Sequence, residues 1–331
     1  MAAVGGSNYP NGFMQGIQIR GMPVQILYPG EVFWVNNSTV LAKGAIAGSN
    51  TNNGTYRSPF STMEYAMGRT LANRGDIIAV MPGHAETIDS ATDWLLDTAG
   101  VAVIGLGSGT RRPTFTFSVA ATANIPVSAA NISLYNLLFV ANFADVTSVF
   151  TVSGTALATD FTVDSCEFRD TTASLNFLTL ITDNATAQNL QGLKFHNNKI
   201  RGLGTTAATT PIKLTSAAHN RVSVTDNNVT LAVLNNTSAL IAAGANILLQ
   251  LEIARNIIFR PNTDTATGGV LLTTSATTDT GMVYDNKMKT LDVAGMIIAT
   301  TSTALGFTEN YISGTADTSG IILPAADSDA A

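Results

Sequence analysis

The chain has 331 residues, of which 17 are basic and 23 acidic, so its formal net charge is −6. Only 12% of the residues are charged and one is a cysteine, which excludes an internal disulfide and a cysteine-based zinc site. The acidic balance argues against a nucleic-acid partner, and no apolar run is long enough to favour a membrane span. We therefore expect neither partner, and no metal or other cofactor.

Residues 1–47 contain turn clusters at Asn8–Gly12 and Tyr28–Gly30, followed by a short apolar strand at Val32–Val35. The first residues lack the basic and apolar regions of a secretory signal, so none is expected. We interpret residues 1–47 as an extended arm with short strands that docks on a partner. The residues expected to make its contacts are Tyr9, Pro10, Phe13, Ile17, Ile19 and Arg20.

Residues 48–74 are predicted to form a linker and a helix. The run that starts at Gly48 (GSNTNNGT) has the composition of a flexible linker. Ser58 is the predicted N-cap of the helix and Pro59 its first residue. Four apolar side chains then share one helical face: Phe60, Met63, Met67 and Leu71.

Residues 75–325 contain a repeat of about 29 residues. Its six-residue unit has apolar residues at the first and sixth positions and, in most copies, Asn at the fourth, as in Val224–Val229. The fourth positions are residues 137, 166, 198, 227, 256, 286 and 310, with steps of 29, 32, 29, 29, 30 and 24. A second, mostly apolar strand starts 10 to 14 residues after each fourth position, from Val149–Val152 in the first repeat to Ile321–Leu323 in the last. Two strands per period predict one rung of a solenoid, whose stacked rungs share a continuous core.

Five of the fourth positions are asparagines: Asn198, Asn227, Asn256, Asn286 and Asn310. Because equivalent residues of stacked parallel strands lie about 4.8 Å apart, these side chains can hydrogen-bond to one another as a ladder. Five surface turn asparagines without mutual contact are the alternative. Cys166 occupies the same position in an earlier rung, where we expect a buried small side chain.

The residues just before the fourth positions include a column of charges: Asp226, Arg255, Asp285 and Glu309. We expect Arg255 to lie between Asp226 and Asp285 in a stack of surface charges, with a ligand-binding or catalytic role as the alternative. Glu167 and Lys199, just after the fourth positions of neighbouring rungs, are expected to pair in the same way.

Three segments carry a resemblance to a known superfamily: Ser58–Phe60, Gly75–Gly83 and Val101–Gly107 with Pro113. Together with the repeats they resemble a right-handed, single-stranded parallel β-helix of the pectin-lyase-like type over roughly residues 50–325. The resemblance implies an all-β fold whose helix plugs the N-terminal end of the solenoid. Residues 75–325 would form the β-helix, and residues 326–331 a C-terminal tail.

The resemblance also implies what an enzyme of this superfamily would need. Its hydrolases carry Asn-x-Asp, Asp-Asp, Gly-His-Gly and Arg-x-Lys elements on successive rungs. This chain has Asn262–Asp264 and an incomplete Gly83–Ala85, but neither an Asp-Asp pair nor an Arg-x-Lys. Carboxylates for calcium beside a basic residue, as in lyases, are not recognisable either. We therefore expect no catalytic site, and we expect His84, Trp34 and Trp94 to have structural roles.

The arm, the helix and the Thr-, Ala- and Asn-rich rungs resemble those of structural proteins of tailed-phage virions that carry such a β-helix. This resemblance implies a capsid decoration, or cement, protein at the virion surface. Its partners would be other copies of itself, as a homotrimer, and the major capsid protein or another virion protein. A phage tailspike or tail fibre that binds a receptor is one alternative, and a polysaccharide lyase or hydrolase is another.

Overall fold

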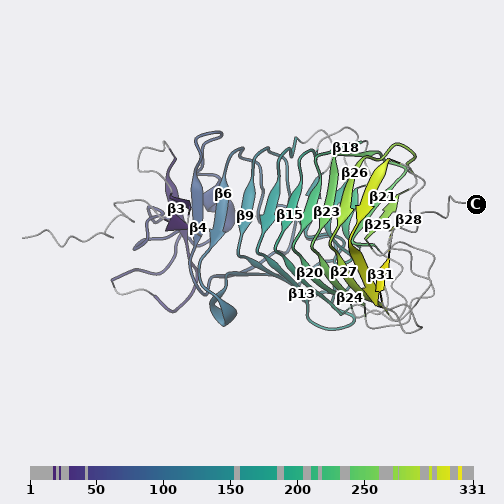
Figure 1. Ribbon diagram of the computed structural model, residues 1–331. Coiled ribbons are helices and arrows are strands. Elements are labelled where there is room, and N and C mark those ends of the chain that lie inside the picture. Colours follow the sequence, from purple (N-terminus) through teal and green to yellow (C-terminus); the bar gives the residue numbers. More distant parts are fainter. Residues whose placement is uncertain are drawn as a thin grey trace, which may run out of the picture.

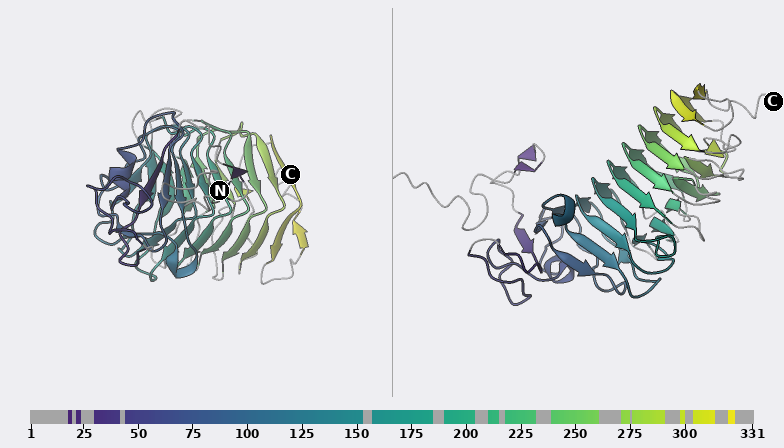
Figure 2. Two further views of the ribbon diagram at one scale, coloured as in Figure 1. Left: turned by 90° about the vertical axis from the view of Figure 1, so that its left-hand side faces the viewer. Right: turned by 90° about the horizontal axis from the view of Figure 1, so that it is seen from below.

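The chain folds into a long parallel β-solenoid in a computed structural model (Figure 1). The structure describes residues 18–19, 22–23, 30–41, 44–152, 157–184, 190–203, 210–214, 218–231, 239–260, 271–274, 276–290, 298–299, 304–313 and 320–322. Three sheets run along its length, so the predicted all-β solenoid is confirmed. Figure 2 shows the strands of successive rungs side by side from one end of the molecule to the other.

Sheet 1 has ten strands, and sheets 2 and 3 have ten and seven. Sheet 1 consists of β3 Val32–Val35, β4 Ile77–Val80, β6 Ala102–Gly105, β9 Ser133–Tyr135, β12 Thr162–Asp164, β15 Lys194–His196, β19 Ser223–Thr225, β23 Leu251–Ala254, β26 Gly281–Tyr284 and β29 Leu305–Thr308. Sheet 2 consists of β5 Ala85–Thr87, β7 Thr114–Phe117, β10 Leu138–Ala141, β13 Glu167–Asp170, β16 Lys199–Gly202, β20 Asn228–Leu231, β24 Ile257–Arg260, β27 Lys287–Thr290, β30 Asn310–Ser313 and β31 Gly320–Ile322. Sheet 3 consists of β8 Ile125–Pro126, β11 Phe150–Val152, β14 Thr179–Asp183, β17 Thr210–Leu214, β21 Ile241–Gly244, β25 Leu272–Thr274 and β28 Ile298–Ala299.

Each rung of the central solenoid therefore has three strands, and the prediction of two was wrong. The six-residue sequence unit is not one strand, because it spans the corner between sheets 1 and 2. In one rung Val224 lies on β19 of sheet 1, whereas Val229 lies on β20 of sheet 2. The two apolar ends of the unit both point inward, which is why they looked like one element in the sequence.

The core is built from stacks of inward residues that the parallel register places above one another. In sheet 2 the buried Phe115, Phe139 and Phe168 are register partners. Their ring centroids are 5.7 Å and 5.2 Å apart, and both contacts are stacked. The column continues through Ile200 and Val229, also buried. Such stacks bury apolar area in every rung, which is the main stabilising contribution of a solenoid.

The predicted helix is shorter than expected and begins later. The α-helix α1 is Met63–Met67, and its N-cap is Thr62, whose side chain accepts a hydrogen bond from the Tyr65 N–H. Phe60 lies before the helix in extended backbone and forms a parallel bridge with Val35, so the expected start at Ser58 was wrong. Met63 and Met67 are buried as expected, but Leu71 is 56% exposed and lies beyond the helix.

The segment expected to be a flexible linker is held by side-chain hydrogen bonds. The Asn50 Oδ1 accepts from the Ser61 and Thr62 N–H groups, at 3.1 Å and 3.3 Å. The Asn52 Nδ2 donates to the carbonyls of Ala47 and Pro59. These contacts fasten the loop to the segment that leads into α1.

The two ends of the solenoid also differ from the expected boundaries. β3 pairs in parallel with β4, so sheet 1 already includes residues expected in the arm. At the other end, β31 pairs antiparallel with β30 of sheet 2. Residues 321–323 were expected to form an apolar strand equivalent to those of sheet 3. That expectation was wrong for the described residues Ile321 and Ile322, which β31 places in sheet 2.

Most of the expected docking arm lies outside the described residues. Tyr9, Pro10, Phe13, Ile17 and Arg20 lie outside the described residues, as do residues 326–331. Ile19 belongs to β1 (Gln18–Ile19), which pairs antiparallel with β2 (Met22–Pro23). Two further elements are the 3-10 helix Gly109–Arg111 and the pair β18 (His219–Asn220) and β22 (Leu248–Leu249). Within the described residues, no helix has the length and apolarity to cross a membrane.

Candidate functional site

The corner between sheets 1 and 2 is a tight turn whose first residue has left-handed backbone. In seven rungs the φ of this residue lies between 49° and 60°, at Asn136, Ser165, Asn197, Asp226, Arg255, Asp285 and Glu309. Asn and Asp tolerate this conformation because their short polar side chains hydrogen-bond locally. Arg255 and Glu309 gain no such local compensation, so their rungs must be held by other contacts.

The asparagine at the next position supplies those contacts. The Asn256 Oδ1 accepts from the backbone N–H of Asn227 at 3.1 Å and from its Nδ2 at 2.9 Å. The Asn256 Nδ2 donates to the Val224 carbonyl and to the Asn286 Oδ1, both at 2.9 Å. The same pattern joins Asn286 to Asn310, with the Asn286 Nδ2 2.8 Å from the Asn310 Oδ1. Each of these asparagines is 2% exposed or less.

The ladder continues in the other direction to Asn198 and ends at Cys166. The Asn227 Oδ1 accepts from the Asn198 N–H, and the Asn198 Oδ1 accepts from the Cys166 N–H, each at 2.9 Å. Cys166 itself is buried, and its Sγ lies 3.4 Å from the Asp164 carbonyl oxygen. A primary amide suits this position because it donates and accepts at once, which a buried corner between rungs requires.

Beside the ladder, the charge column forms one close ion pair. The Arg255 Nε and Nη2 donate to the two carboxylate oxygens of Asp226, both at 2.8 Å. The remaining Nη1 donates to the Tyr284 hydroxyl at 3.2 Å, and Asp285 receives no ion pair from it. Among the described residues Glu309 has no ion pair either, so the structure does not bring the four predicted charges together. The hydrogen bond from Arg255 lowers the pKa of Asp226.

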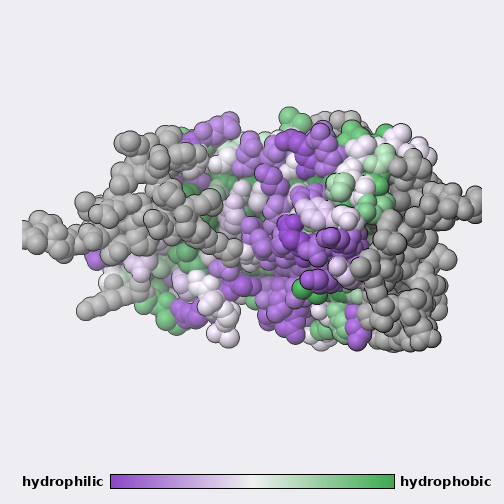
Figure 3. Space-filling view, viewed as in Figure 1, coloured by the Kyte–Doolittle hydropathy of each residue, from purple (hydrophilic) through white to green (hydrophobic). Residues whose placement is uncertain are grey.

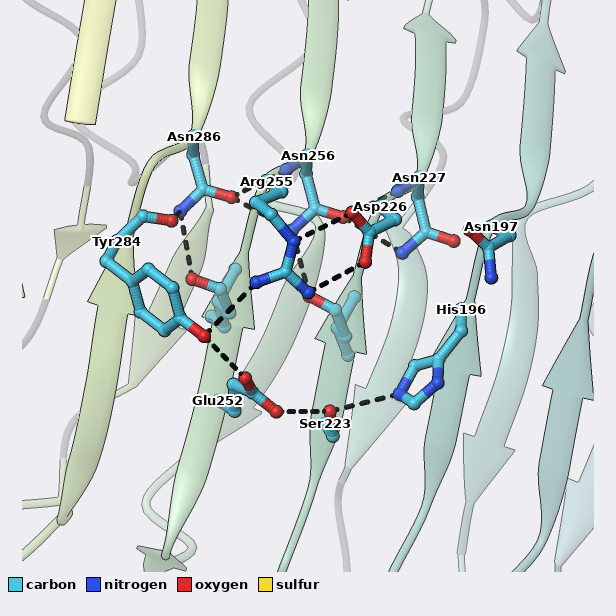
Figure 4. Close-up of polar contacts among 12 residues, drawn as sticks. His196, Asn197, Ser223, Asp226, Asn227, Glu252, Arg255, Asn256, Tyr284 and Asn286 are labelled. Atoms are coloured by element: carbon cyan, nitrogen blue, oxygen red, sulfur yellow. Dashed lines mark hydrogen bonds and ion pairs between the residues drawn. The ribbon is translucent and has the colours of Figure 1, made fainter. Parts of the chain in front are cut away.

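The Tyr284 hydroxyl leads from this ion pair into a chain of polar side chains on the outer face of sheet 1 (Figure 4). It donates to the Glu252 Oε1 at 2.7 Å, and the Ser223 hydroxyl donates to the Glu252 Oε2 at 2.7 Å. The His196 Nε2 lies 3.0 Å from the Ser223 Oγ. We call His196, Ser223, Glu252 and Tyr284 the outer polar chain. Its members come from four successive strands of sheet 1: β15, β19, β23 and β26.

The hydrogen bonds fix where the protons lie in the outer polar chain. Because the Ser223 hydroxyl hydrogen points to Glu252, the His196 Nε2 must carry a hydrogen and donate it to Ser223. Burial lowers the pKa of His196, which favours the neutral ring. Burial alone would raise the pKa of Glu252, but the hydrogen bonds from Ser223 and Tyr284 outweigh it and lower that pKa.

This arrangement does not activate a nucleophile. In a Ser–His–acid triad the carboxylate holds the second ring nitrogen of the histidine, so that the first can accept the serine proton. Here His196 and Glu252 both contact the same Ser223 oxygen, and Glu252 already takes its proton. A carboxylate with a lowered pKa and both oxygens occupied is a poor general base. The outer polar chain is therefore suited to joining four rungs of the solenoid.

The expected pair of Glu167 and Lys199 is not formed, although the two residues are register partners in sheet 2. The Glu167 carboxylate is largely buried and lies 3.1 Å from the Arg112 Nη1 and 2.7 Å from the Arg169 Nη2. The Arg169 Nε and Nη2 both donate to Oε1 and the Arg112 Nη1 donates to Oε2, so two arginines satisfy both oxygens, which a single lysine ammonium would do less well. Lys199 is left exposed on the outer face of sheet 2.

The other residues singled out in the sequence have packing contacts. His84 is buried, with its Nε2 3.0 Å from Glu86, whose carboxylate accepts from the Met63 N–H at the start of α1. Trp94 and Trp34 are both buried, and Trp94 packs on Phe115. Asn262–Asp264 lie outside the described residues.

Two features were missed in the sequence. A second column of left-handed residues precedes the strands of sheet 1, and includes Asn131, Asp160, Arg221 and Gln250. Its signal is a glycine, Asn or Asp two positions before a strand, at Gly75, Gly100, Asn131, Asp160 and Gly192. Arg221 and Gln250 carry no such signal. The second feature is the fully buried His219 near Asp183, at 3.7 Å. The His219 Nδ1 is 3.1 Å from the Leu190 carbonyl oxygen, and burial lowers its pKa.

The described part of the chain contains no group of three or more His, Cys, Asp or Glu side chains that could hold a metal ion. No protein-family profile matches the chain, and no curated protein matches it. Among solved structures the chain is similar to one described as "Rhamnogalacturonan lyase", at 10% identity and a TM-score of 0.48. That match covers 89% of this chain and 90% of the other. At this level the likeness concerns the fold alone.

Proposed function

We propose that this protein is a non-enzymatic structural subunit of a phage virion that decorates and stabilises the capsid. The observation that supports a structural role best is the state of the outer polar chain. Both Glu252 oxygens and the Ser223 hydroxyl are used by other side chains of the same face. An acid–base site needs at least one group free to exchange a proton with a substrate.

The contacts that join the rungs support the same proposal. The ladder, the outer polar chain and the phenylalanine stack each connect side chains that are about 29 residues apart in sequence. A protein that stabilises a capsid needs a rigid body whose rungs do not separate under mechanical force. Buried and fully paired amides resist such separation, because opening one rung exposes several unpaired groups.

The location and assembly state rest on the sequence resemblance. In this proposal the protein is a homotrimer, its arm contacts the major capsid protein or another virion protein, and it lies at the capsid surface. A closed threefold assembly is compatible with a solenoid of low charge, whose flanks can pack side by side about one axis. A tail location is the competing form of the proposal.

Imaging tests the proposal directly. Virions produced with and without the gene for this chain would be compared by electron cryomicroscopy. We expect elongated density at symmetry-related positions on the head of the complete particle, and its loss in the deletion. Density confined to the tail, or identical particles, would contradict capsid decoration. Sedimentation of the purified protein tests the trimer, and a monomer at micromolar concentration would argue against it.

A further inference from the structure

The outer face of sheet 2 carries four exposed cations that form no ion pair with any described residue. Lys199 and Arg201 point outward from β16, and Lys287 and Lys289 point outward from β27. All four are exposed, and none has an ion pair within the described part of the chain. This concentration is notable in a protein whose net charge is −6.

The register places these residues in two straight columns. Lys199, Asn228, Ile257 and Lys287 are successive partners in the first column. Arg201, Thr230, Phe259 and Lys289 are successive partners in the second. The two pairs of cations are three strands apart, which corresponds to about 14 Å along the solenoid. We call this surface the sheet 2 basic face.

Between the two cationic pairs lies an exposed apolar platform. Ile257 is 51% exposed and Phe259 is 38% exposed, on a strand that could have carried polar residues at both positions. The Lys289 Nζ lies 5.8 Å from the Phe259 ring centre. Covering exposed aromatic and aliphatic side chains is favourable, because it removes apolar surface from water. Tyr311, the next partner of Lys287, is 38% exposed as well.

In the preceding rung, by contrast, the outward arginine of sheet 2 is neutralised by a carboxylate. Arg169 is the register partner of Arg201, and it is paired with Glu167 at 2.7 Å. Within the described residues, the other four cations pair with no carboxylate. Glu167 is the register partner of Lys199, but its oxygens are paired with Arg112 and Arg169. Like charges held close together repel one another, so an anion bound across them is favoured.

We propose that the sheet 2 basic face binds an acidic polysaccharide that lies along the solenoid axis. Its carboxylate or sulfate groups would contact the two cationic pairs, and a sugar ring between them would pack its C–H face on Phe259 and Ile257. A linear polymer fits, because the cations lie in straight columns parallel to the axis. A nucleic acid fits less well, since the net charge of −6 repels a dense polyphosphate.

Binding would be measured by fluorescence anisotropy with labelled oligogalacturonate, which carries carboxylates only, and with a labelled heparin oligosaccharide, which also carries sulfates. Neutral dextran and single-stranded DNA of similar length are the comparison probes. We expect binding of at least one acidic glycan, weaker at higher salt, and no binding of dextran.

Lys287→Glu should weaken glycan binding by about tenfold or more, because it reverses one contact charge beside the platform. Phe259→Ala should also weaken it, which separates sugar stacking from charge attraction alone. The matched control is Lys194→Glu, which makes the same charge change at an exposed lysine on sheet 1. Circular dichroism would show that each variant is folded.

Three results would overturn the proposal: no binding of either glycan, equal weakening by Lys194→Glu and Lys287→Glu, or DNA binding at least as tight with the same residue dependence. The last result would assign the face to nucleic acid. None of these outcomes depends on where the protein lies on a particle, so the proposed decoration role is tested separately.

Discussion

Replacement of Asn256 by alanine is the sharpest test of the ladder. The side chain is fully buried, accepts two hydrogen bonds from Asn227 and donates to Val224 and Asn286. Asn286 keeps a donor after the substitution, because its Oδ1 also accepts from the backbone N–H of residue 256. The Asn227 Nδ2 keeps the Phe195 carbonyl.

The Asn227 backbone N–H has no such second partner, because its acceptor is the Asn256 Oδ1. An orphaned buried donor costs about 1–3 kcal/mol, so we expect Asn256→Ala to lower the free energy of unfolding by that amount. The measurement is urea denaturation followed by far-UV circular dichroism, with the midpoint compared between variants.

The matched control is Asn228→Ala, the adjacent asparagine, which is exposed on β20. We expect this change to alter stability by no more than about 0.5 kcal/mol, as for most surface substitutions. Equal midpoints for the two variants would refute the reasoning, because the ladder hydrogen bonds would then contribute nothing that an exposed amide does not.

Three further predictions concern other contacts. Asp76→Asn should lower the free energy of unfolding by about 2–3 kcal/mol in urea denaturation. Buried Asp76 accepts from two backbone N–H groups and from Arg74, whereas an amide offers one acceptor oxygen. A loss smaller than that of Asn228→Ala would contradict this prediction. Phe139→Ala should cost about 3–5 kcal/mol through loss of the phenylalanine stack, whereas exposed Phe259→Ala should cost little; similar melting temperatures would argue against the stack. Burial lowers the pKa of His219 below its ordinary 6.5, so the unfolded chain takes up this proton first as the pH falls. Its contribution to stability is therefore complete above about pH 6.5 and declines below it, and His219→Gln should reduce that decline in unfolding curves measured from pH 5 to 8.

The repeat made the fold predictable, because inward residues and asparagines recur at the spacing of one rung. The number of strands per rung could not be predicted in this way, since Val224 and Val229 belong to different sheets although only four residues separate them. The start of α1 was misjudged for a similar reason. Ser58 and Pro59 suit the start of a helix, but the tertiary bridge between Phe60 and Val35 keeps that segment extended.

The outer polar chain was beyond sequence reasoning because two of its three contacts, His196 with Ser223 and Glu252 with Tyr284, run diagonally between rungs. Ser223 and Glu252 are register partners, but His196 is the partner of Thr225, two residues from Ser223. Which diagonal neighbour a side chain chooses depends on rotamers and on competing donors. The choice of Tyr284 over Asp285 by Arg255 has the same origin.

From the rung of Leu134 onward, the corner between sheets 1 and 2 has a constant length, whereas the other two corners do not. The inward residue of sheet 1 is followed five positions later by the inward residue of sheet 2, as in Leu134 and Phe139 or Phe195 and Ile200. From sheet 2 to sheet 3 the corresponding interval varies, with 11 residues from Phe139 to Phe150 and 14 from Ile258 to Leu272. Figure 3 shows that the middle of the face of sheet 1 is mainly hydrophilic. Insertions and deletions can therefore accumulate at the other two corners, while the corner between sheets 1 and 2 keeps its register. Related chains could then display very different loops on the same solenoid.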